Sequence, residues 1–215
     1  MKCHKGIGGA LKHAPMMIVA SCLGLTLLAS PAFADDVAAG TSASQGDSSA
    51  MGVSTTWNQY GQCEWAIDQG CLVIRPANGA PSAELDYYYT NAPWSSYEDE
   101  ILNVRFEGVV EVEKPAYMFA YLHNAESIDL TGLDTSSAVN MDSMFLACKS
   151  LKSLDLSGVD SSCVTSMQGM FSGCSALESV NLAGLDTSNV SDMAVMFARC
   201  SSLKSIDVSG FNTSQ

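Results

Sequence analysis

MDSMFLACKSLKSLDLSGVDSSCVTSMQGMF, residues 141–171, begins and ends on the same Met-x-x-Met-Phe word. The Met-Phe pair that closes this word recurs every 26 residues, beginning at 118, 144, 170 and 196, with no insertion between copies. Self-similarity at such a period predicts a solenoid, in which each repeat forms one coil and buries its apolar side against the next. The other apolar and glycine positions that keep the period are Ile128, Leu154, Val180 and Ile206; Leu130, Leu156, Leu182 and Val208; Gly132, Gly158, Gly184 and Gly210.

Two hydrophobic periods within one unit predict two kinds of element. Residues 203–208 end in the alternation Ile-x-Val, which predicts a short strand with its apolar side chains turned inward. Residues 190–197, Val-x-x-Met-x-x-Met-Phe, place four apolar side chains on one helical face, and Thr187 or Ser188 is placed to cap that helix. The expected fold class is therefore an α/β solenoid with leucine-rich-repeat-like coils of one short strand and one short helix each.

A small β-rich module is expected before the solenoid, at residues 57–100. Two β-type runs, 63–67 and 71–74, flank the turn word Asp-Gln-Gly at 68–70 and predict a hairpin. The aromatic stretch around Trp94 and Tyr97 favours a small packed core over the alternative of a carbohydrate-stacking site. Residues 101–109 match the strand part of the repeat with a spacing of 24 to the next unit, which suits a terminal, capping repeat of a solenoid spanning 101–215.

The N-terminal 34 residues have the form of a signal peptide. Basic residues precede an apolar run at 16–28, and Ala32-Phe33-Ala34 is a small-x-small cleavage word, so cleavage is expected after Ala34 and the protein is expected to be exported. The alternative is a lipoprotein signal with lipid on Cys22. Residues 35–56, rich in Ala, Ser, Gly and Thr, predict a flexible linker, and no later segment is apolar enough to be a transmembrane span.

The charge of the chain argues against a nucleic-acid partner. The whole sequence carries 10 Lys and Arg against 23 Asp and Glu, a formal net charge of −13. Binding to phosphates needs a basic surface, and this chain is strongly acidic. The acidity is interpreted as a source of solubility for an exposed protein, with an acidic docking surface as the alternative.

The unit L-x-x-L-D-L-S-G-x-D-T-S-x-V-x-x-M-x-x-M-F-x-x-C resembles the leucine-rich repeat of the BspA-like surface protein family of bacteria. Residues 61–67, 72–76 and 93–97 resemble the module that often precedes those repeats, so the resemblance covers about 61–215. It implies a curved solenoid on the cell surface and a function in adhesion to host proteins or to neighbouring cells. The implied partners are therefore surface proteins of the host or of neighbouring cells.

Three cysteines, Cys148, Cys174 and Cys200, recur at one position per coil, and Leu122 takes this position in the first full unit. A leucine can replace a buried apolar thiol but not a metal ligand, and no zinc-like C-x-x-C spacing occurs. We therefore expect a buried column of thiols and neither a metal site nor a bound cofactor.

The other cysteines of the expected folded part stand outside this column. Cys163 occupies a position that polar residues hold in other repeats, so it is expected to be exposed. A tight turn at 68–70 would set Cys63 opposite a residue near Arg75, which disfavours a bridge to Cys71. Several free thiols in an exported protein would suit a reducing habitat, and the redox states of these three remain open from sequence.

Two columns of aspartates raise the alternative of calcium binding. Asp134, Asp160 and Asp186 fall in register, as do Asp129, Asp155 and Asp207, and stacked carboxylates repel one another unless they are neutralised. Asparagine replaces aspartate at 212 in the first column and at 181 in the second. The position therefore needs a hydrogen-bond acceptor more than a charge, and this favours turn or capping duty over calcium.

Catalysis has weak support in the sequence. After removal of the leader the chain holds one histidine, His123, and no nucleophile–base arrangement recurs or clusters. The acidic run Glu98-Asp99-Glu100 could in principle supply the paired carboxylates of a hydrolase, but such runs are usually solvated turns. The protein is therefore expected not to be an enzyme.

We predict an exported binding protein of adhesin type whose concave strand face carries the ligand site, with a structural spacer or stalk as the alternative. The chain is expected to be a fragment, because Gln215 falls inside a repeat just before its predicted helix. The predicted ligand-binding positions are Glu126, Ser127 and Asp129; Lys152, Ser153 and Asp155; Glu178, Ser179 and Asn181; Lys204, Ser205 and Asp207.

Overall fold

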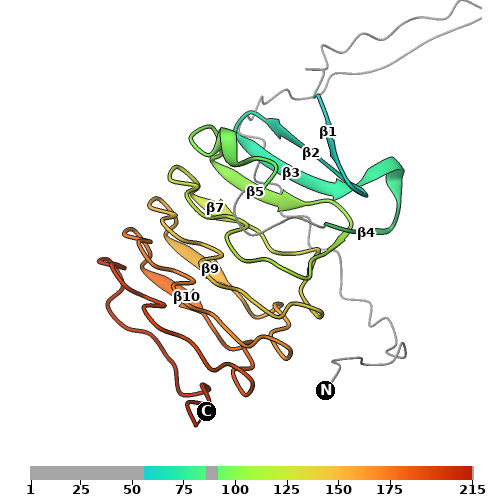
Figure 1. Ribbon diagram of the computed structural model, residues 1–215. Coiled ribbons are helices and arrows are strands. Elements are labelled where there is room, and N and C mark those ends of the chain that lie inside the picture. The colour runs from blue at the N-terminus through green and yellow to red at the C-terminus, as the bar shows by residue number, and fades with distance from the viewer. Residues whose placement is uncertain (1–55, 86–91, 215) are drawn as a thin grey trace, which may run out of the picture. The chain divides into compact units, whose positions relative to one another are not determined.

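The structure, a computed structural model, describes residues 56–85 and 92–214, and this part of the chain is a β-solenoid (Figure 1). The predicted solenoid is confirmed, whereas its α/β character is wrong. In the described residues, helix is limited to two short 3-10 segments, η1 (Ala77–Gly79) and η2 (Ser95–Tyr97). Neither has the length and apolarity of a membrane span. The predicted signal peptide, Cys22 and all but the last residue of the predicted linker lie outside the described residues.

Antiparallel strands stand at the N-terminal end of the solenoid. They are β1 (Asn58–Tyr60), β2 (Cys63–Asp68) and β3 (Cys71–Pro76), paired in the order β1-β2-β3. Asp68 is paired with Cys71, and the two residues between them, Gln69 and Gly70, have φ values of 48° and 79°. Two central residues with positive φ define the hairpin turn whose twist matches that of the strands, so the predicted hairpin is confirmed.

The first side of the solenoid, here called the strand face, is built from parallel strands of successive coils. The strand β3 pairs with β5 (Asn103–Phe106), and β5 pairs with β7 (Ser127–Ile128). Farther along, β9 (Ser153–Asp155) pairs with β10 (Ser179–Asn181). Because β3 and β5 belong to one sheet, that sheet crosses the predicted domain boundary between residues 100 and 101. The strand β3 thus stacks on the solenoid one coil before the predicted terminal repeat.

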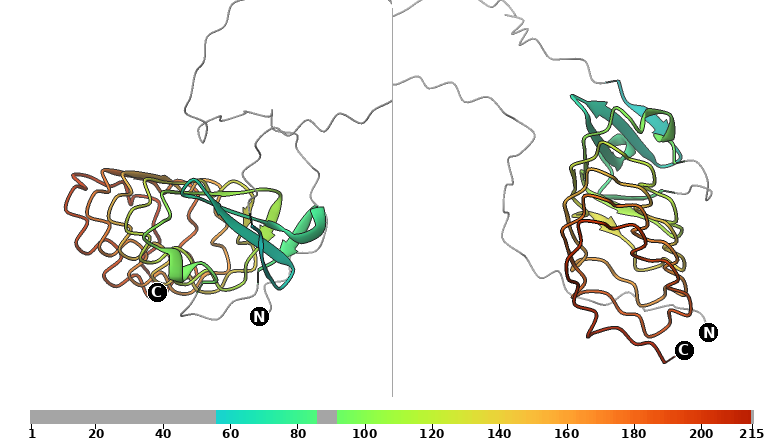
Figure 2. Two further views of the ribbon diagram at one scale, coloured as in Figure 1. Left: turned by 90° about the horizontal axis from the view of Figure 1, so that it is seen from above. Right: turned by 90° about the vertical axis from the view of Figure 1, so that its left-hand side faces the viewer.

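The second side carries shorter parallel strands, namely β4 (Ser82–Glu84), β6 (Val109–Glu111) and β8 (Leu133–Asp134). The corner between the first two sides is tight. At Gly132, φ is 94° and an added Cβ would lie 2.5 Å from the carbonyl oxygen of Gly108, so the backbones of successive coils touch there and glycine is required. Figure 2 shows the coils stacked in sequence order, as the colours indicate.

The third side consists of five stretches, residues 92–97, 115–122, 141–148, 167–174 and 193–200, here called the turn segments. The repeat pattern predicted helices in the last four stretches, and the structure has β-turns there instead; the first stretch contains η2. In the segment 141–148, the amide of Met144 donates to Met141 O at 3.4 Å and the amide of Cys148 donates to Phe145 O at 3.3 Å. Ala147 between them has a left-handed φ of 59°, at which a right-handed helix cannot continue.

Other amides of a turn segment join it to the next coil. Those of Ser143, Phe145 and Ala147 donate to carbonyl groups of the segment 167–174 at 2.7–2.9 Å. A helix would have consumed these amides within the segment. A Met-x-x-Met word also fits positions i and i+3 of a turn, so both side chains face the core without any helix. The predicted capping role of Thr187 or Ser188 is therefore wrong as well.

A stack of aromatic rings runs through the core along the turn segments. Phe119, Phe145, Phe171 and Phe197 follow one another with ring centroids 5.7, 5.4 and 5.3 Å apart and planes within 21°. Trp94 continues the stack at the N-terminal end, 6.3 Å from Phe119. Rings in near-parallel contact contribute about 0.5–1.5 kcal/mol per pair beyond their buried area, so this stack holds adjacent coils together.

Candidate binding surface

All twelve predicted binding positions are exposed on the strand face or on its continuation in the last coil. They alternate with apolar residues that face inward, among which Ile128 and Leu154 are buried. The alternation is regular in β7, β9 and β10, whereas residues 203–208 have no assigned strand and Val208, expected to be buried, is 44% exposed. The structure therefore brings the predicted residues together on one side of the solenoid.

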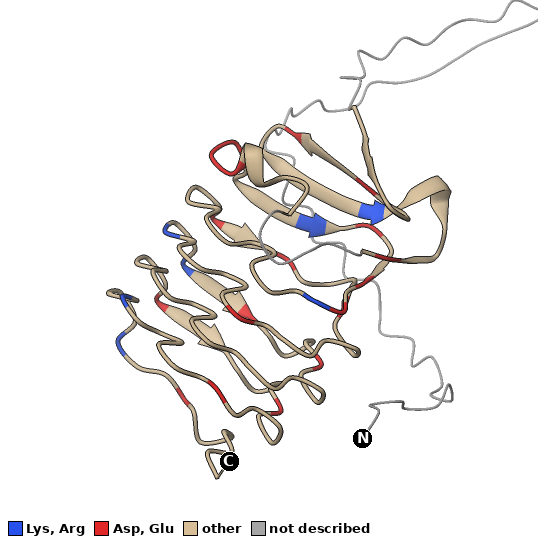
Figure 3. Cartoon of the chain, in the orientation of Figure 1, with Lys and Arg blue, Asp and Glu red and all other residues tan. Residues whose placement is uncertain are grey.

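The strand face carries charges of both signs. Glu126, Lys152, Glu178 and Lys204 alternate in sign from coil to coil at one edge of the face, beside the register pair Ser153–Ser179. None of the ion pairs found in residues 56–85 and 92–214 involves these four side chains. Among the charged residues of the described chain, acidic ones are more frequent than basic ones, as Figure 3 shows. The four charges are therefore available to a partner.

The aspartate column on the strand face forms Asx turns. The Oδ1 atoms of Asp129, Asp155, Asn181 and Asp207 each accept the backbone amide two residues farther on, at 2.9–3.1 Å. Backbone and side-chain hydrogen bonds from Ser157 lower the pKa of the exposed Asp155 carboxyl. Asn181 makes the same bond as the three aspartates, as expected if this position needs a hydrogen-bond acceptor more than a charge.

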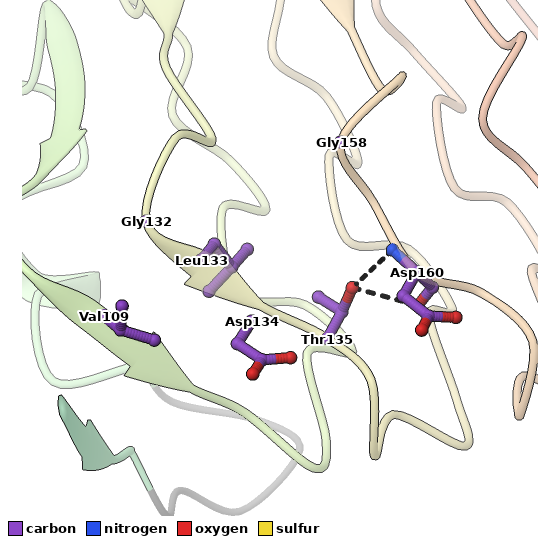
Figure 4. Close-up of a pocket in the computed structure, with 7 residues that line it drawn as sticks. All are labelled: Val109, Gly132, Leu133, Asp134, Thr135, Gly158 and Asp160. Carbon is purple, nitrogen blue, oxygen red and sulfur yellow. Dashed lines mark hydrogen bonds between the residues drawn. The ribbon is translucent and has the colours of Figure 1, made fainter. Parts of the chain in front are cut away.

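The second column repeats this turn and adds a link between coils. Asp134, Asp160, Asp186 and Asn212 each accept the amide two residues on. The hydroxyl that follows, at Thr135, both accepts from the amide of Asp160 at 3.0 Å and donates to its carbonyl oxygen at 2.9 Å (Figure 4). The buried residues Ser161 and Thr187 make the equivalent pairs of bonds one and two coils farther on, a role that the repeat pattern did not predict.

A shallow groove of about 260 Å³ lies beside this link. It opens between β6, β8 and the next coil, and Figure 4 shows its lining. The Asp134 carboxylate and the Thr135 hydroxyl at its wall are engaged in the Asx turn and in the bridge described above. The groove thus presents polar atoms that already serve the backbone, and it is a weak candidate for ligand chemistry.

The predicted column of thiols is buried in two coils and half-buried in the last. The Sγ atoms of Cys148, Cys174 and Cys200 each donate to the carbonyl oxygen of the ring-stack residue one coil back, at 3.1 Å. The hydrogen bond with Cys174 and burial raise the pKa of Cys148, and burial raises that of Cys200 to about 11. The same hydrogen bond lowers the pKa of Cys174. Cys148 and Cys200, whose thiols keep their protons at neutral pH, are poor nucleophiles and poor metal ligands.

The other described cysteines differ in detail from expectation. Cys63 is a buried free thiol whose register partner is Pro76, one residue beyond Arg75, so no bridge joins it to Cys71. Its Sγ donates to Glu84 O at 3.6 Å, and burial raises its pKa to about 11. Cys163 is half-buried where exposure was expected.

The acidic run at 98–100 forms part of a turn that is held in place by hydrogen bonds. Asn124 donates to Asp99 O at 2.8 Å, and His123 Nδ1 lies 3.8 Å from Asp99 Oδ1, whose side chain is 81% exposed. Glu98 is half-buried and Glu100 is exposed. Within the described ranges, no group of three or more His, Cys, Asp or Glu side chains could hold a metal ion.

Comparison with known proteins gives one match. Residues 113–215 match the sequence model of a family described as Mycoplasma protein of unknown function, DUF285. This part of the chain is similar to that family. No curated protein and no solved structure matches the chain. The matched range begins within the coil of Phe119 and covers the regular repeats, so the similarity concerns the solenoid.

Proposed function

We propose that the protein is an exported, cell-surface binding protein of adhesin type, related to the BspA-like proteins that its repeats resemble. In this proposal the strand face binds a protein or another ligand on a host or neighbouring cell. The observation that carries the proposal is the exposure of all twelve predicted positions on one regular face. Side chains at these positions can vary without disturbing the buried Ile128, Leu154 or ring stack, which is how a solenoid supports recognition.

The charges of the strand face support a protein ligand. Alternating carboxylates and ammonium groups that lack an ion-pair partner in the described chain offer a pattern that a surface of complementary charge would match. Such complementarity governs specificity and association rate more than affinity. Binding through Lys152, Glu178 and Lys204 should therefore weaken as the ionic strength rises.

Reversing three charges tests the proposal. The variant K152E/E178K/K204E changes the strand face, and the variant K149E/R199E/E113K makes the same net change at exposed positions outside the twelve. Adhesion to immobilised host matrix proteins and to whole cells is measured for both. We expect the first variant to lose adhesion and the second to keep it.

Unchanged adhesion of the first variant, or equal losses in both, would remove the strand face as the binding site. The second candidate function is a spacer that holds another domain away from the envelope, which the continuous inter-coil ring stack favours because it stiffens the solenoid. If the solenoid is a spacer, neither charge variant should alter adhesion, whereas deletion of one repeat from the solenoid should alter it.

A further inference from the structure

A second hollow of about 260 Å³ lies between the first two turn segments, away from the strand face. The segment 92–97 and the following Glu98 form one wall, and the segment 115–122 forms the other. Three aromatic residues line it, Trp94, Tyr117 and Tyr121, together with the half-buried carboxylate Glu98. We call it the tyrosine pocket; its remaining lining residues are Ala92, Ser95, Met118 and Ala120.

The pocket exists because the link between coils changes here. In later coils, backbone amides of one turn segment donate directly to carbonyls of the next, as Phe119 N does to Met144 O at 2.9 Å. At the first junction the indole Nε1 of Trp94 donates to Met118 O at 3.1 Å. A side chain reaches farther than a backbone amide, and the Trp94–Phe119 ring spacing of 6.3 Å exceeds the 5.3–5.7 Å of the later rings.

Both walls are held firmly. Trp94 is buried, and Trp65 packs edge-on against it at 6.3 Å and against Tyr97 at 5.7 Å. The turn that carries Glu98 is tied to the next coil by the bond from Asn124 to Asp99 O. A pocket with walls fixed before binding loses little conformational entropy when it takes a ligand.

The two tyrosines occupy positions that the backbone disfavours for them. Tyr117 and Tyr121 have φ values of 60° and 65°, in the left-handed region that is costly for bulky residues. The left-handed conformation belongs to every turn segment of the repeat, and the other coils place only small or non-aromatic residues there: Ser143, Ala147, Gly169, Gly173, Val195 and Arg199. The two tyrosine residues are 38% and 45% exposed, so burial in the core does not offset this cost. Among the regular turn segments, only 115–122 places aromatic side chains at both of these positions, and both line the pocket.

The charge around the pocket selects a cation. Glu98 lines it, Asp99 and Glu100 follow directly, and the chain as a whole has a formal charge of −13. Aromatic faces combined with a carboxylate recognise organic cations, and guanidinium stacks on such rings better than ammonium does. The same chain shows this chemistry: Arg75 lies 3.4 Å over the ring of Trp57 and donates to Glu64 at 2.7 Å.

We propose that the tyrosine pocket binds the guanidinium group of an arginine side chain in a basic segment of a partner protein. The rings of Tyr117 and Tyr121 contact the planar cation, and Glu98 accepts its hydrogen bonds. This site does not depend on ligand binding by the strand face, because its residues belong to the turn segments.

The test uses a synthetic arginine-containing peptide and a counterpart in which each arginine is citrulline, a neutral group of nearly the same shape. Binding to the full chain is measured by calorimetry at low and at higher salt. We expect the citrulline peptide to bind about tenfold more weakly or worse, as loss of cation–π and ionic contacts implies. Affinity for the arginine peptide should also fall as salt is added.

Three variants complete the test. Y117G/Y121G places at both positions the residue that coil 167–174 already uses, so the fold tolerates it, and we expect binding about tenfold weaker. Glu98→Gln should weaken binding and flatten its salt dependence. Val195→Gly alters the equivalent exposed left-handed position of the last turn segment and should change nothing. Circular dichroism melts verify that each variant is folded.

Several results would overturn the proposal. They are absence of binding to the arginine peptide, equal binding of the citrulline peptide, and unchanged affinity after removal of both rings from a folded protein. A loss of affinity in Val195→Gly equal to that in Y117G/Y121G would place the peptide elsewhere.

Discussion

Thr135→Val removes one hydroxyl from the link between coils and leaves the shape of the side chain almost unchanged. Thr135 is 2% exposed, and its hydroxyl joins the amide and the carbonyl of Asp160, at 3.0 and 2.9 Å. Each buried backbone group that loses its partner costs about 1–3 kcal/mol. The adjacent groove of about 260 Å³ lets water approach, which places the cost near the lower end of that range for both groups. We therefore expect a loss of about 2–3 kcal/mol in the free energy of unfolding.

Urea unfolding measures this loss against a matched control. With an m-value of about 2 kcal/mol per M, the midpoint should fall by about 1 M or slightly more. Thr135→Ser keeps the hydroxyl, as Ser161 does one coil farther on, and should cost less than about 1 kcal/mol, mainly for one lost methyl group. Amide exchange at Asp160 should accelerate in the valine variant alone. Equal midpoints for the valine and serine variants would refute the bridging role of the hydroxyl.

Three further predictions concern a glycine at a tight corner, an Asx turn and a buried thiol. Gly184→Ala sets a Cβ 2.5 Å from Ser157 O and should cost about 1–3 kcal/mol in thermal unfolding, whereas Gly158→Ala, with nothing within 4 Å, should be neutral or slightly stabilising. Asp186→Asn keeps the turn acceptor and should change stability by less than about 0.5 kcal/mol, with a melting temperature that responds to neither calcium nor chelator; a calcium-dependent shift in the wild type would revive the metal site. Burial raises the pKa of the Cys63 thiol from 9.0 to about 11, so between these values the unfolded thiol loses its proton while the folded one keeps it. The free energy of unfolding should consequently fall over that pH range, and less steeply in Cys63→Ala; identical slopes would show that this thiol is not shielded.

The stacking of coils was predictable because it depends on period alone. A Met-Phe pair that returns every 26 residues needs the same environment each time, and only stacked coils supply it. The inward and outward positions of the strand face followed from the alternation around Leu154, and all twelve outward residues are exposed. Side chains alternate between the two faces of a strand, so when the apolar residues are buried on one face, the residues between them lie on the other.

The kind of element on the third side was not predictable from spacing. Apolar residues three apart lie on one side both in a helix and across a β-turn, so Met141 and Met144 satisfy either. The deciding signal was Gly169, inside the helix expected at 164–171, together with Gly173 just after it. Glycine is unfavourable within a helix and suits left-handed turn positions, where the structure places both residues.

Two features depend on contacts that the repeat pattern hides. The repeat pattern did not predict that Trp94 belongs to the ring stack, because tryptophan replaces phenylalanine at this position and no methionine precedes it. The hydroxyl bridges were missed because Ser or Thr after Asp reads as turn chemistry. The sequence does carry a sign of these bridges, because positions 135, 161 and 187 each hold Ser or Thr and never Ala or Val.

The indole link at Trp94 makes one joint of the solenoid accessible to point mutation. Bonds between backbone groups persist through nearly every substitution except proline, so the later turn segments cannot be separated by changing a side chain. At the first joint, Trp94→Phe would keep a ring in the stack and remove the N–H that holds Met118. A lineage could therefore open or tighten the tyrosine pocket by single codon changes while every other coil stays fixed.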